Sequence, residues 1–150
     1  MFLSKKPIII ICIIAALVIG ITAGCLIYDL KLRGDGIKVR DKALFGFDAE
    51  DVTYVQLMTG YGDRRGFEEK EELEGLASRL KEIKYNKVKL DIPTQGYTYH
   101  MTVYYDSKGR EKSDQFIILS SGAVKHGDRI YYLTPESKPI IEEIIALMPQ

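Results

Sequence analysis

The sequence of 150 residues contains no tryptophan, only two histidines and only two cysteines. Both cysteines, Cys12 and Cys25, lie in the apolar N-terminal segment, so the rest of the chain has neither a disulfide framework nor a cysteine-ligated zinc site. The histidines, His100 and His126, have no metal-ligating residue three or four positions away, and no HExxH-like spacing occurs. We therefore expect no metal site and no cofactor.

Motifs for phosphate binding and nucleophilic catalysis are also missing. The glycines of residues 60–66 fit neither the dinucleotide-binding fingerprint nor the Walker A loop, and their spacing is typical of a turn. The Ser-Ser-Gly run at 120–122 lacks the G-x-S-x-G elbow of serine hydrolases. The carboxylates of residues 68–74 are predicted to form a solvated helix face. The sequence therefore predicts no catalytic residue and a protein that is not an enzyme.

Charge is balanced over the chain, with a formal net charge of zero. The part that follows residue 33 carries 17 basic and 20 acidic residues with the two signs dispersed. Binding to nucleic acid depends on clustered lysine and arginine, so we expect no nucleic-acid partner.

The one long apolar run extends from Pro7 to Tyr28, 22 residues without a charge. As a helix it would be about 33 Å long, enough to cross a hydrocarbon core of about 30 Å. We therefore predict a transmembrane anchor at 7–28, a cytoplasmic tail at 1–6, a short polar tether at 29–36 and a soluble domain at 37–150. Membrane lipid is then one partner of the chain.

Two other fates of the apolar segment remain open. Residues 21–25 (Ile-Thr-Ala-Gly-Cys) are similar to a bacterial lipobox, in which the signal ends at Gly24 and Cys25 is lipidated, although the residues after Cys25 stay apolar. A conventionally cleaved secretory signal is the third possibility. The short tail with two lysines predicts export of the domain, whereas four basic residues within 31–40 argue for the opposite orientation. We expect an extracytoplasmic domain.

The soluble part alternates between strand and helix patterns. Strands are predicted at 51–59, 64–67, 85–92, 97–105, 112–120, 124–125 and 129–133, and amphipathic helices at 68–84 and 135–148. Residues 37–47 are ambiguous, with an apolar Leu-Phe-Gly-Phe at 44–47 that we expect to pack under the sheet. Because short turns join most strands, we predict an α+β fold, with a mainly antiparallel sheet and two helices packed on one face.

Tyrosine is abundant, with ten in the chain, and many of them fall in adjacent predicted strands. Neighbours such as Tyr104 and Tyr105 must point to opposite faces of a sheet, so some rings lie outside the helix-covered core. Exposed tyrosines are effective contacts for protein partners, although cross-strand packing on a solvated sheet explains them equally well. The predicted binding face comprises Tyr97, Tyr99, His100 and Tyr104.

The chain as a whole resembles small membrane-anchored or lipoprotein-like proteins of Gram-positive bacteria. The similarity lies in the Lys-Lys start and apolar segment, Leu-Phe-Gly-Phe at 44–47, Asp-Val-Thr at 51–53, Leu-Lys-Glu-Ile-Lys-Tyr at 80–85 and Gly-Asp-Arg-Ile-Tyr-Tyr at 127–132. The resemblance implies an extracytoplasmic domain of unknown function and supplies no functional residues.

Together these features favour a membrane-anchored, non-enzymatic module that binds, senses or scaffolds at the cell surface, with a protein or peptide as its partner. The alternative is a regulatory or structural subunit of a membrane complex that associates through its span. Gly20-x-x-x-Gly24 in the apolar run would allow a second helix to approach closely.

Overall fold

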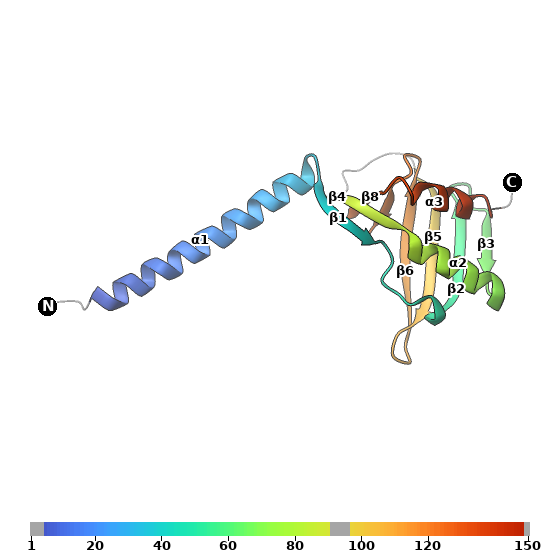
Figure 1. Cartoon of the computed structure of the whole chain (residues 1–150), viewed down its shortest axis with the longest axis horizontal. Helices are drawn as coiled ribbons and strands as arrows, with labels where there is room; N and C mark the ends of the chain where they lie inside the picture. Colours follow the sequence, from blue (N-terminus) through green and yellow to red (C-terminus); the bar gives the residue numbers. More distant parts are fainter. Residues whose placement is uncertain (1–4, 91–96, 149–150) are drawn as a thin grey trace.

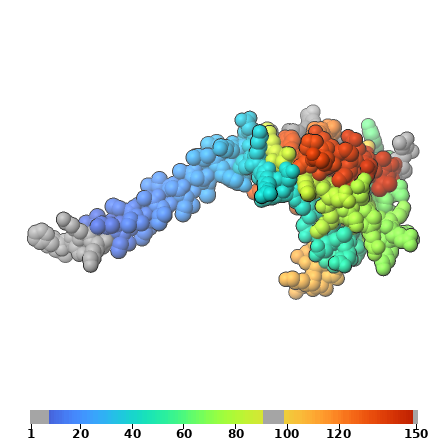
Figure 2. All heavy atoms as spheres, in the orientation of Figure 1, coloured from blue at the N-terminus to red at the C-terminus, as the bar shows by residue number. Residues whose placement is uncertain are grey.

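The N-terminal helix projects from a folded domain in the computed structural model, which describes residues 5–90 and 97–148 (Figure 1). This helix, α1 (Lys5–Arg33), exposes its apolar side chains along nearly all of its length. Within the described ranges it is the single helix long and apolar enough to span a membrane, a criterion that an N-terminal signal sequence also meets. The space-filling view shows that α1 is separate from the domain over most of its length (Figure 2).

The structure differs from the predicted tether at 29–36, because α1 continues to Arg33. An ion pair of 2.9 Å between Asp29 and Arg33 joins successive turns, and Leu32 is buried, with 3% of its surface exposed. The connection is reduced to Gly34–Gly36, and the backbone N–H of Gly36 donates to the Lys31 carbonyl at 2.9 Å. Burial of Leu32 against the domain favours the additional helical turn, and composition alone does not reveal that contact.

The domain is built on an antiparallel sheet of eight strands in the order β1-β4-β8-β7-β6-β5-β2-β3. The strands are β1 (Ile37–Ala43), β2 (Val52–Thr59), β3 (Arg64–Phe67), β4 (Lys84–Leu90), β5 (Tyr97–Asp106), β6 (Glu111–Leu119), β7 (Val124–His126) and β8 (Arg129–Leu133). Every adjacent pair is antiparallel. The predicted α+β fold is confirmed, and the ambiguous segment at 37–47 supplies β1, an edge strand.

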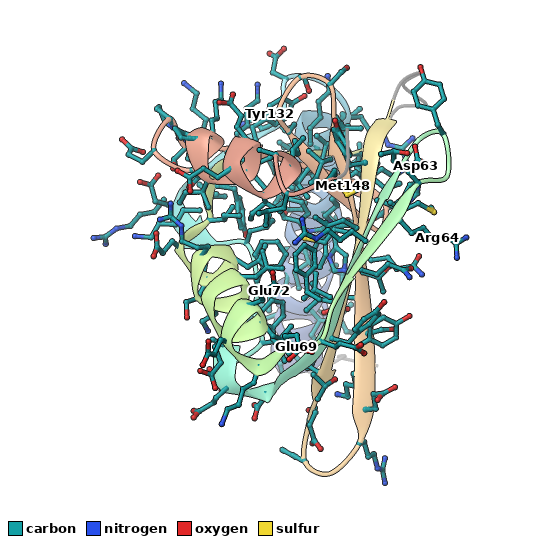
Figure 3. The ribbon with its side chains drawn as sticks, turned by 90° about the vertical axis from the view of Figure 1, so that its right-hand side faces the viewer. Asp63, Arg64, Glu69, Glu72, Tyr132 and Met148 are labelled. Carbon is teal, nitrogen blue, oxygen red and sulfur yellow. The ribbon has the colours of Figure 1, made fainter. Side chains whose placement is uncertain are left out.

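Two helices, α2 (Lys70–Glu82) and α3 (Lys138–Ile145), lie on the same side of the sheet (Figures 1 and 3). The apolar stripe predicted for the first of them is buried: Leu73, Leu76, Ala77, Leu80 and Ile83. It packs with the helix-facing residues of β2, β5 and β6 into one core. Amphipathic periodicity therefore located both the helix and its buried face.

The segment between β1 and β2 closes one side of this core. Phe45 and Phe47 are buried, and the Phe45 ring lies 4.6 Å from that of Phe116, measured between centroids. A short 3-10 helix (Ala49–Asp51) then leads into β2. The expected apolar packing of residues 44–47 is confirmed.

The last helix is shorter than the predicted 135–148, because a buried turn precedes it. The Ser137 hydroxyl accepts a hydrogen bond from the backbone N–H of Lys84 at 2.8 Å and lies 3.0 Å from the Thr134 hydroxyl. Both hydroxyl-bearing residues are buried. These bonds attach the start of α3 to β4, so regular helix begins only at Lys138.

Candidate functional site

The candidate site is the face of the sheet opposite α2 and α3, which we call the open face. In the part of the chain that the structure describes, no helix packs on it (Figure 3). Strand register places its central residues in cross-strand rows: Tyr54, Tyr104 and Ser113; Gln56, Thr102 and Gln115; Met58, His100, Ile117 and Lys125. These side chains are half-buried or exposed. The open face is therefore polar and aromatic, with few aliphatic groups.

A pair of tyrosines occupies one end of the open face. The rings of Tyr54 and Tyr104 are directly opposite on β2 and β5, with centroids 5.6 Å apart. The Tyr54 ring also covers Gly66 on the edge strand β3, where an added Cβ would lie 2.2 Å from the Tyr54 hydroxyl. Sequence reasoning missed Tyr54, although its alternation with the buried Val55 and Leu57 indicated the outer face.

A hollow lies beside His100 at the other end of the open face. The hollow has a volume of about 360 Å³ and is lined by His100, Gln115, Ile117, Lys125, His126 and Gly127. The His126 ring stacks on Phe116 with 4.6 Å between centroids, and its Nε2 atom lies 3.8 Å from an Asp114 carboxylate oxygen. The His126 ring therefore lies on the helix side of the sheet, and His100 is the histidine whose side chain lies on the open face. The polar lining can bond an amide or carboxylate group.

The predicted binding face is divided by the structure. His100 and Tyr104 lie on the open face, but Tyr99 points to the helix side and packs against the core. There it lines a cleft of about 480 Å³ with Ile118, Ile141 and Ile145 among its neighbours. The physical reason is that successive residues of a strand alternate between faces. For Tyr97 the backbone pairs with Leu119, and its side chain is outside the described part.

Two other tyrosines serve packing. The Tyr105 hydroxyl donates to the Asp114 carboxylate at 3.0 Å, and burial together with this bond raises the pKa of Tyr105 above its usual value. Burial also raises the pKa of Tyr131, whose ring lies 4.8 Å from that of Tyr85. Raised values keep both hydroxyls protonated at neutral pH, so neither supplies a phenolate for catalysis.

Metal-ligating side chains are not clustered. Over residues 5–90 and 97–148 no group of three or more histidine, cysteine, aspartate or glutamate side chains is placed to hold a metal ion. Cys12 and Cys25 are exposed on α1. The chemistry of the open face is thus that of hydrogen bonding and aromatic contact.

Comparisons of this chain with protein-family models, with curated proteins and with solved structures gave no match.

Proposed function

We propose that the protein is a membrane-anchored, non-enzymatic binding module whose open face contacts a protein or peptide. The observation that carries the proposal is the open face, where the Tyr54–Tyr104 pair and the hollow beside His100 lie on one surface. Tyrosine contributes strongly to protein interfaces because it offers large contact area for little loss of conformational entropy. Half-buried side chains already held by strand pairing lose less freedom on binding than side chains of a loop.

Attachment to a membrane is supported by α1, whose apolar residues are exposed to solvent in the isolated chain. An apolar helix of this length is stable in a bilayer and costly in water. A retained span fits a helix that continues through Cys25 to Arg33, whereas the tether of a lipidated protein is normally polar. We propose that the domain is extracytoplasmic, because the short tail with two lysines stays inside.

The open face is tested by chemical crosslinking of the full chain in native membranes. Replacing His100 and Tyr104 together with alanine is expected to lower the yield of the crosslinked partner about tenfold, since the loss of an anchoring tyrosine costs about 2 kcal/mol. Glu74→Ala, an exposed change on α2 on the other side of the sheet, is the control and should leave the yield unchanged. Equal yields from both variants would refute the open face as the contact surface.

The alternative, a subunit that associates through its span, is supported by Gly20 and Gly24. Both face open space, with nothing within 4 Å of an added Cβ, and they are spaced for close helix contact. Replacing α1 up to Tyr28 with an unrelated transmembrane helix distinguishes the two proposals. We expect the chain with the exchanged span to remain in complex with its partner on native gel electrophoresis. Loss of that complex would favour the subunit that associates through its span.

A further inference from the structure

A second surface lies on the helix side of the domain, in a groove between α2 and α3. The groove has a volume of about 280 Å³. Its apolar lining comes from Phe67 of β3, Leu76 of α2, Ile144 of α3 and Leu147, which follows α3. Leu147 is 37% exposed. Outside α1, it and Tyr61 are the only exposed large hydrophobic residues among the side chains that the structure describes. The groove therefore has a floor of largely buried apolar side chains, with Leu147 as its exposed apolar residue.

Gly75 keeps this groove open. It lies in the interior of α2 and lines the groove, and an added Cβ would meet nothing within 4 Å. A glycine inside a helix lowers stability relative to alanine because its backbone loses more freedom on folding. Packing within the domain thus does not explain a glycine at this position. A bound group that fills the groove does explain it, because a side chain here would take up the same space.

The rim of the groove is acidic. Glu71, Glu72 and Glu143 line it beside Arg79. Arg79 is paired with Glu143 and Glu82, and Arg65 lies 3.4 Å from Glu72. Glu71 is thus the rim carboxylate that has no ion pair with any residue that the structure describes.

The helix layer as a whole, residues 68–82 and 136–148, holds nine acidic and four basic residues. Outside it, residues 34–150 carry 13 basic and 11 acidic residues, so the negative charge of the domain is concentrated here. A second copy that presented the same face would be repelled, and a basic segment would be attracted.

We propose that this groove binds a basic peptide segment of a partner protein, with an apolar side chain over Gly75 and lysine or arginine side chains against Glu71 and its neighbours. The groove lies at the end of the domain remote from α1, between the N-terminal half of α2 and the end of α3 (Figures 1 and 3). It is thus accessible to a partner that is not in the membrane. The site is independent of the open face.

The test uses the full chain in phosphatidylcholine nanodiscs, with empty nanodiscs as the blank. The probe is a short fluorescein-labelled peptide of lysines with two leucines one helical turn apart, and its affinity is measured by fluorescence anisotropy. Gly75→Leu fills the groove with a good helix former and is expected to weaken binding at least about tenfold. Ser78→Leu adds the same side chain to an exposed position of α2 that does not line the groove, and should bind as the unchanged chain does.

Charge is tested in the same assay. Glu71→Lys is expected to weaken binding several-fold and to reduce its dependence on salt, whereas Glu74→Lys, an equal change in charge away from the groove, has a smaller effect. The proposal would be overturned if the probe showed no measurable binding, or if the two leucine variants bound it with equal affinity. It would also be overturned if a peptide with glutamate in place of each lysine bound equally well.

Two further outcomes assign the binding elsewhere. A dimer that dissociates on Gly75→Leu would show that the occupant is a second copy, and would overturn the basic peptide. Loss of probe binding in the His100 and Tyr104 double variant, with binding retained by Gly75→Leu, would place the peptide on the open face instead. If the crosslinking test refuted the open face, binding of the probe in the groove would be unaffected. The two proposals can therefore be refuted separately.

Discussion

Replacing Phe45 with alanine is expected to lower the free energy of unfolding by about 3–5 kcal/mol, the range for a large aromatic residue truncated in a core. Phe45 is 2% exposed and contacts the rings of Phe47 and Phe116 at 5.5 and 4.6 Å between centroids. Its removal leaves a cavity among aromatic rings that cannot readily collapse. The measurement is guanidinium unfolding of the full chain in mild detergent, followed by the near-ultraviolet circular dichroism of the tyrosines.

Tyr61→Ala is the matched control for this truncation. Tyr61 is 100% exposed in the turn between β2 and β3, so its removal should change the free energy of unfolding by less than about 0.5 kcal/mol. If the two variants unfolded at the same denaturant concentration, the segment between β1 and β2 would not be part of the core.

The second large effect is expected at Gly36, where α1 joins the domain. Gly36→Ala should lower the free energy of unfolding by about 2–3 kcal/mol, since a non-glycine residue is strained in the left-handed region and must also displace a neighbour. Gly36 has a φ of +83°, and its added Cβ would lie 2.8 Å from the Val88 carbonyl oxygen. Hydrogen exchange should accelerate at the amides of β1 that pair with β4, starting from Ile37 opposite Val88.

Gly62→Ala separates the two contributions to that effect. Gly62 also has a positive φ, +96°, but nothing lies within 4 Å of its added Cβ. This variant therefore reports backbone strain alone, about 1–2 kcal/mol. A loss of stability at Gly36 no larger than that at Gly62 would contradict the close contact with Val88.

Local patterns in the sequence were sufficient for much of the fold. The spacing of Leu73, Leu76 and Leu80 located α2, and the alternation along 97–105 located β5 and its buried face. The strand β1 was ambiguous in the sequence because its alternation covers only residues 37–40 and is followed by exposed charged or small residues. Its pairing with β4 is a tertiary contact between distant segments.

The candidate sites were less predictable than the fold. Sequence reasoning identified His100 and Tyr104 as surface residues of one strand, but only the strand register shows that Tyr54 lies beside Tyr104. The groove is formed by three elements, so no single stretch of sequence describes it. One local signal was present and was not used: Gly75 interrupts the helix pattern in a segment that otherwise favours helix.

The short junction at Gly34–Gly36 has a mechanical consequence. Leu32 is buried against the domain and only three residues separate α1 from β1, so we expect α1 and the domain to move together. Apolar helices longer than the hydrocarbon core tilt to match its thickness. With α1 as a membrane span, such a tilt would move the end of the domain that is remote from α1. We then expect bilayer thickness to change the distance between the groove and the lipid headgroups.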